Sequence, residues 1–66
     1  MNIRKLLIDL RAGKSQESVA KELGITQQHL SAIEHGNKNP GFNLMNKFES
    51  YYNKKIQDLF PDIFLK

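Results

Sequence analysis

The stretch that decides the fold is KSQESVAKELGITQQHLSAIEHGNKNP, residues 14–40. Ser15 is typical of a helix N-cap, and a helix is predicted over 16–23 because its apolar residues share one face. Gly24 favours the left-handed conformation that commonly ends a helix. The predicted buried residues of this helix are Val19, Ala20 and Leu23.

A further helix is predicted over 27–35, with Thr26 as its N-cap and Gly36 after its end. Ile25 and Leu30 have the spacing of a hydrophobic staple. Leu30 and Ile33 are expected in the core, where the small side chain of Ala20 allows the two helices to cross closely. This combination predicts a helix-turn-helix over 16–35.

The helix predicted over 27–35 has a second face, opposite its apolar side. This face is polar, and it is uncharged near the start of the helix. On a helical wheel the residues of this face fall within an arc of about 140°. Taken alone, this helix is equally consistent with a solvated polar helix end that has no binding role. The outward residues are Gln27, Gln28, Ser31, Ala32 and His35, with His29 and Glu34 at the edges of the apolar side.

The rest of the chain predicts a single all-α domain over 1–66 with five short helices. The first helix starts at Ile3, with Asn2 as N-cap and Gly13 as stop, and leaves Ile8 on its outer face. In the fourth helix one arc is apolar, and Asn53 is its stop. That arc contains Leu44, Met45, Phe48, Tyr51 and Tyr52. Ile56, Leu59 and Phe60 predict a last short turn before Pro61.

Composition limits the class of protein. Ten Lys and Arg against seven Asp and Glu give a net charge of +3, which suits a polyanionic partner. The chain has no cysteine, no metal-ligand spacing and no catalytic constellation, so we expect neither an enzyme nor a cofactor. No apolar run approaches the ~20 residues that span a bilayer. A soluble protein of the cytoplasm is therefore expected.

The motifs SQESVA, LGIT, LSxIExG and NP together resemble the lambda-repressor-like helix-turn-helix family, the Cro and xenobiotic-response-element type. The resemblance covers residues 3–60. It implies a compact five-helix domain that binds double-stranded operator DNA as a homodimer. In related repressors, the glutamine that matches Gln16 contacts phosphate and braces the one that matches Gln27. The stretch TQQ is similar to repressors in which consecutive glutamines read successive base pairs.

The candidate site follows from these features. Base readout is assigned to Gln27, Gln28, Ser31 and Ala32, because a glutamine amide can pair with adenine in the major groove. Phosphate contacts are assigned to Ser15, Gln16, Asn37, Lys38, Asn39, Lys14 and Lys47. The apolar tail over 61–66 suggests a dimer interface of Phe60, Ile63, Phe64 and Leu65, with packing of the tail on its own core as the alternative.

One position departs from the family pattern. Relatives often have an arginine seven residues before Gln16, paired with the glutamate that matches Glu34, whereas this chain has Asp9 there. Either Glu34 finds another cation, Lys5 or Arg11, or the register assigned to the first helix is wrong.

The resulting prediction is a bacterial, phage or plasmid transcriptional regulator, a repressor rather than an activator, on a pseudo-palindromic operator. One alternative is the antitoxin of a toxin–antitoxin pair, which binds a toxin as well as its own operator. Another is a protein-interaction module that keeps the helix-turn-helix as a scaffold. The dependence of binding on salt separates the DNA-binding alternatives from the last.

Overall fold

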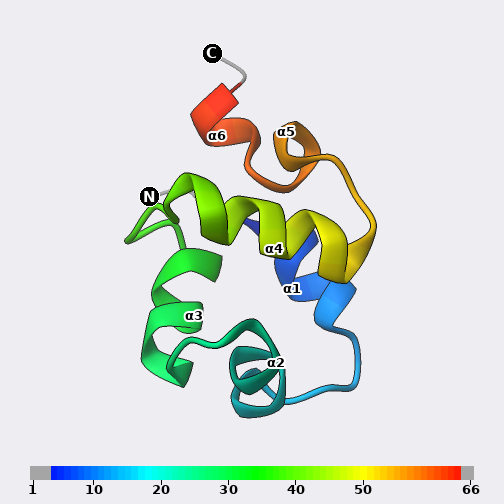
Figure 1. The fold of residues 1–66 in the computed structure, drawn as a ribbon, viewed down its shortest axis with the longest axis vertical. Coiled ribbons are helices and arrows are strands. Elements are labelled where there is room, and N and C mark those ends of the chain that lie inside the picture. The colour runs from blue at the N-terminus through cyan, green and yellow to red at the C-terminus, as the bar shows by residue number, and fades with distance from the viewer. Residues whose placement is uncertain (1–3, 65–66) are drawn as a thin grey trace.

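The computed structural model describes residues 4–64, and every regular element in that range is a helix. The elements are α1 Lys5–Arg11, α2 Gln16–Leu23, α3 Gln27–Glu34, α4 Phe42–Tyr52, α5 Ile56–Leu59 and α6 Pro61–Phe64. In Figure 1, α4 crosses the middle of the molecule, with α2 and α3 below it and α5 and α6 above it. The predicted all-α class is confirmed, with α6 as an additional short helix.

The two helices of the predicted helix-turn-helix begin where their caps predict; α2 also ends as predicted, whereas α3 ends at Glu34, one residue earlier than predicted, with His35 as its C-cap. Ser15 Oγ accepts a hydrogen bond from the backbone N–H of Ser18 at 3.1 Å, and Thr26 Oγ1 accepts one from His29 N–H at 3.1 Å. Gly24 ends α2 with a φ of 76°, in the left-handed region. These contacts leave a turn of only three residues between the helices, so α3 is held at a fixed angle against α2.

The core lies between α4 and the other helices. Leu7, Val19, Ala20, Leu23, Leu30, Ile33, Phe48, Leu59 and Phe60 are all buried. Phe48 and Phe60 pack edge to face, with ring centroids 5.5 Å apart. Because α2 and α3 each contribute one apolar face to this cluster, their opposite faces must point toward solvent.

The first helix differs from its predicted bounds. The expected start at Ile3 and the expected cap Asn2 lie outside the described residues, and α1 begins after Arg4. It ends at Arg11, one residue earlier than predicted, because Ala12 rather than Gly13 takes the positive φ, at 54°. Ile8 is half-buried, so the outer face of α1 is not fully exposed.

Arg4 forms the most extensive polar network of the described residues. Its side chain is almost fully buried and donates to both carboxylate oxygens of Asp62, at 3.0 and 2.8 Å. The same guanidinium donates to the carbonyls of Ile33 and Lys38, each at 2.8 Å, and to Asn39 Oδ1. It therefore joins α6 to the end of α3 and to the loop that follows α3.

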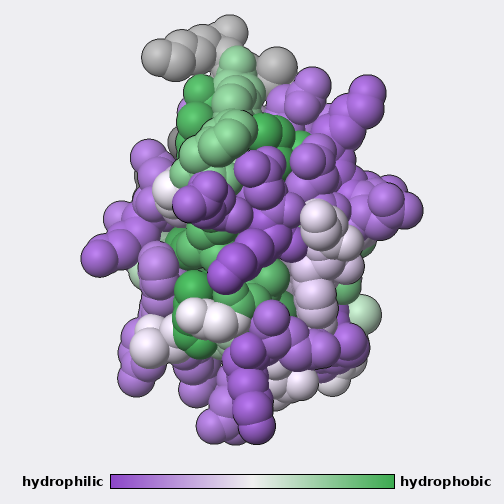
Figure 2. All heavy atoms as spheres, in the orientation of Figure 1, coloured by the Kyte–Doolittle hydropathy of each residue, from purple (hydrophilic) through white to green (hydrophobic). Residues whose placement is uncertain are grey.

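Part of the described C-terminal segment packs on the protein's own core. Phe60 is 0% exposed, so its assignment to an interface is wrong: its ring is occupied by Phe48 and by the Arg4 guanidinium, 5.2 Å from the ring centroid. Ile63 also packs against the core, whereas Phe64 is 44% exposed. Leu65 lies outside the described residues. Hydrophobic atoms reach the surface over α5 and α6 (Figure 2).

Candidate nucleic-acid interface

The outward face of α3 has the polar character that its sequence predicts. Gln27 and Gln28 are exposed in the first turn, and Ser31 and Ala32 are half-buried in the second. Leu30 and Ile33 on the opposite side are fully buried. The two glutamine amides therefore lie at the surface.

Two hollows flank this face of α3. The first has a volume of about 450 Å³, and its lining comes from α2, α3 and the following loop. It is lined by Gln16, Gln27, Gln28, Ser31, Ala32 and Asn37. The second, of about 380 Å³, is lined by Thr26, Gln28, His29, Ala32 and Lys38. Every predicted base-reading residue and three predicted phosphate-contacting residues thus lie around the same helix face.

The loop that carries Asn37, Lys38 and Asn39 is fixed by backbone hydrogen bonds. The N–H groups of Asn37 and Lys38 both donate to the carbonyl of Ala32, at 2.8 and 3.2 Å. Since Arg4 also binds the Lys38 carbonyl and the Asn39 side-chain oxygen, the loop is held from the inside. The Lys38 side chain and the Nδ2 group of Asn39 are not used in these contacts.

Two of the predicted phosphate-contacting residues, Lys14 and Lys47, do not line the hollows beside α3. Lys14 Nζ donates to Tyr51 Oη at 3.2 Å and lies 3.7 Å from Glu22 Oε1. The hydrogen bond to Tyr51 and then the charge of Glu22 raise the pKa of the Lys14 ammonium. The partners of Lys14 thus belong to α2 and α4, and its contact with phosphate stays a prediction.

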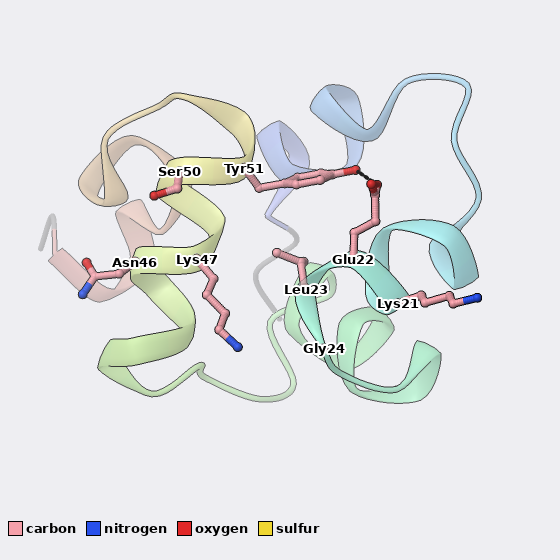
Figure 3. A pocket seen from close by; sticks show the side chains of 8 residues that line it. All are labelled: Lys21, Glu22, Leu23, Gly24, Asn46, Lys47, Ser50 and Tyr51. Carbon is pink, nitrogen blue, oxygen red and sulfur yellow. Dashed lines mark hydrogen bonds between the residues drawn. The ribbon is translucent and has the colours of Figure 1, made fainter.

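Lys47 lies on α4, as does Tyr51, the hydrogen-bond partner of Lys14. It lines a hollow of about 590 Å³ between the end of α2 and α4, and Figure 3 shows its side chain extending toward Gly24. A side chain at Gly24 would have its Cβ 3.7 Å from Lys47 Nζ. Tyr51 closes one end of this hollow, where its hydroxyl donates to Glu22 Oε1 at 2.6 Å (Figure 3). Lys47 does not line either hollow beside α3.

The cation that pairs with Glu34 is Arg11. Arg11 Nε donates to Glu34 Oε2 at 2.9 Å, and the Glu34 side chain is 0% exposed. Lys5 instead lies 3.3 Å from Asp9 at the surface. Glu34, predicted at a helix edge, is thus buried. The expected repulsion between Asp9 and Glu34 is not a problem, because Asp9 pairs with Lys5 and Glu34 pairs with Arg11.

Gln16 also contacts Glu34, which the sequence did not reveal. Its Nε2 donates to Glu34 Oε1 at 2.9 Å. The brace between Gln16 and Gln27 that the resemblance implied is not among the hydrogen bonds of residues 4–64, although both side chains line the same hollow. The amide of Gln16 is therefore held from the protein interior.

A helix-turn-helix family model matches residues 3–59 of the chain. The chain belongs to the helix-turn-helix family of transcriptional regulators. Its relatives include an uncharacterized HTH-type transcriptional regulator of Methanocaldococcus jannaschii, 39% identical over 46 residues, which are 70% of each chain. Another, from Archaeoglobus fulgidus, is 35% identical over 48 residues, or 73% of this chain and 69% of the relative. No solved structure gives a significant match.

Membership of this family identifies the chain as a DNA-binding regulator. In a helix-turn-helix the second helix enters the major groove, and here that helix is α3. None of the helices described within 4–64 is long and apolar enough to cross a membrane.

Proposed function

We propose that the protein is a transcriptional repressor that recognises a pseudo-palindromic double-stranded operator in the cytoplasm, as a homodimer. The observation that carries the proposal is the outward face of α3, where two exposed amides stand beside small side chains. B-DNA's major groove admits one α-helix, and small residues allow that helix to approach the base edges closely. An operator with half-sites about 34 Å apart would match two such helices.

Base readout in this proposal belongs to Gln27 and Gln28. A glutamine side chain forms a bidentate pair with adenine by accepting from N6–H and donating to N7. Both amides lie in the first turn of α3, the end that contacts bases in this motif. Ser31 and Ala32 follow along the same face, where the Ala32 methyl group suits contact with a thymine methyl.

Phosphate binding is assigned to residues on either side of α3. Ser15 and Gln16 stand at the start of α2, where free N–H groups and the helix dipole favour an anion. Asn37, Lys38 and Asn39 stand on the loop after α3, and all three are exposed. These contacts would set the register of α3 on the duplex without reading its sequence.

The proposed dimer uses the exposed part of the tail. Phe64 is the exposed aromatic residue of α6, and Ile63 beside it is half-buried. The substitution Phe64→Ser removes the apolar ring and leaves the Arg4–Asp62 contact intact. Sedimentation should give a dimer for the unaltered protein and a monomer for this variant. The same mass for both proteins would reject this interface.

The experiment that tests DNA recognition compares two substitutions on duplex binding. Gln28→Ala should cost about 1 to 3 kcal/mol of binding free energy on a preferred site, with little effect on unrelated duplexes. Lys38→Ala should weaken binding to all duplexes alike and reduce the magnitude of the log–log salt slope by about 0.9. Binding that does not depend on salt would contradict the proposal.

A further inference from the structure

The loop that follows α3 is held by a residue that belongs neither to α3 nor to the loop. Arg4 is buried, and its guanidinium donates to the Lys38 carbonyl at 2.8 Å and to Asn39 Oδ1. The backbone N–H of Arg4 also donates to the carbonyl of Glu34, the last residue of α3, at 2.8 Å. One residue before α1 thus contacts both the end of α3 and the loop to which phosphate binding is assigned.

Asp62 holds this guanidinium from the side of α6. Its two carboxylate oxygens accept hydrogen bonds from Arg4 at 3.0 and 2.8 Å, and a two-point contact of this kind keeps the planar group in one orientation. The Arg4 side chain makes five hydrogen bonds in all, as many as a guanidinium has N–H groups. No donor is left over, so a change at Asp62 must alter the contacts that Arg4 makes with the loop.

We propose that Asp62 and Arg4 are positioning residues for DNA binding, through which α6 sets the place of the loop 37–39 against the phosphate backbone. This inference rests on the proposed function and deepens it. The three loop residues are exposed, so they are accessible to DNA while their backbone is held from inside. A loop that is ordered beforehand loses less conformational freedom on binding. Because phosphate contacts carry no sequence information, the network should raise affinity for every duplex alike.

The substitution Asp62→Asn separates positioning from simple electrostatics. Removal of a negative charge by itself favours binding to a polyanion, so electrostatics alone predicts tighter binding. Positioning predicts the opposite: affinity for a duplex of unrelated sequence should fall about 2- to 30-fold, the range for substitutions that contact neither ligand. Asp58→Asn on α5 makes the same charge change at an exposed carboxylate, and its affinity should stay the same or rise. Binding by Asp62→Asn as tight as that of Asp58→Asn would overturn the proposal.

A double-mutant cycle with Lys38→Ala separates positioning from a general loss of stability. If Asp62 acts through the loop, its effect on affinity should shrink by about half or more, on a logarithmic scale, once the Lys38 ammonium is absent. All four proteins are compared at a temperature at which each is fully folded, because Asp62→Asn lowers stability as well. Effects of the two substitutions that simply add would show that they act independently, and would overturn the proposal.

The order of the loop is also measurable in the full chain without DNA. The backbone N–H groups of Asn37 and Lys38 donate to the Ala32 carbonyl, so their hydrogen exchange reports on local opening of the loop. Both should exchange faster in Asp62→Asn than in Asp58→Asn, and equal rates would overturn the inference. If the unaltered protein binds no duplex, the proposed function fails. If it binds and the two aspartate variants bind alike, only this inference fails.

Discussion

Replacing Asp62 by asparagine tests whether the buried Arg4 network holds the tail and the α3–α4 loop together. Asp62 accepts two hydrogen bonds from a guanidinium whose side chain is 1% exposed, and Asp62 itself is 19% exposed. Removing one partner of a buried ion pair costs about 3 to 5 kcal/mol of unfolding free energy. Arg4 keeps its two carbonyl acceptors and Asn39, so a cost at or just below the bottom of that range, about 2 to 3 kcal/mol, is expected here.

The expected cost of Asp62→Asn is a large fraction of the total free energy of unfolding, so it is easy to measure. A 66-residue domain has a free energy of unfolding of roughly 3 to 10 kcal/mol, and 1 kcal/mol corresponds to about 4 to 8 °C in Tm. Asp62→Asn should therefore lower Tm by roughly 10 to 20 °C in thermal unfolding followed by circular dichroism. Asp58→Asn, an exposed carboxylate nearby on α5, is the matched control and should change little.

The same variant has a predicted pH signature. The hydrogen bonds from Arg4 lower the pKa of the Asp62 carboxyl below its ordinary value. A lowered folded-state pKa contributes stability above the unfolded-state pKa, and this contribution is lost as pH falls through the folded-state value. In Asp62→Asn, the free energy of unfolding should therefore decrease less steeply as the pH is lowered. A variant with unchanged stability and unchanged acid dependence would refute the role of the Arg4–Asp62 contact.

Further predictions concern single contacts. Tyr52→Phe should raise the free energy of unfolding by about 1 kcal/mol, because the buried Tyr52 hydroxyl has no hydrogen-bond partner among residues 4–64. Burial, followed by the charge of Glu34, raises the pKa of Tyr52 to about 12. Stability of the unaltered protein should therefore fall between about pH 10 and 12, and alkaline denaturation should show a smaller loss in Tyr52→Phe. Gly24→Ala should cost about 1 kcal/mol in urea titration, since its φ is 76°; an unchanged midpoint would argue against the left-handed turn.

The helix-turn-helix could be predicted from sequence because its determinants are local. Ser15 and Thr26 cap their own helices within three residues, and Gly24 ends α2 through its own backbone conformation. The outward position of Gln27 and Gln28 follows from helical periodicity once Leu30 and Ile33 are assigned to the core. These features require no knowledge of the rest of the fold.

The missed features depend on contacts between distant parts of the chain. Arg4 and Asp62 are 58 residues apart, and no local pattern shows that a charged residue before α1 is buried by the tail. Helical periodicity gives the angle of Glu34 around the helix axis and so predicts a helix-edge position. It does not show that α1 covers this position and buries the side chain. Phe60 was assigned to an interface because an apolar tail looks the same whether it packs on its own core or on a second chain.

The lysines illustrate a different limit. Lys14 and Lys47 lie near the helix-turn-helix in sequence, but Tyr51 and the groove between α2 and α4 take their side chains away from the hollows beside α3. The partners of Lys14 are Tyr51 Oη on α4 and Glu22 Oε1 on α2, and neither position is close to Lys14 in sequence. The spacing of basic residues alone therefore does not show toward which part of the surface their side chains are directed.

Selection of binding sites from a pool of random duplexes, run in parallel with the unaltered protein and Gln28→Ala, tests base recognition by α3 most directly. The unaltered protein should recover one common site, and the variant should recover the same site with preference lost at one or two base pairs. Recovery of no common site, or of an identical site by both proteins, would contradict the assignment of base readout to this face.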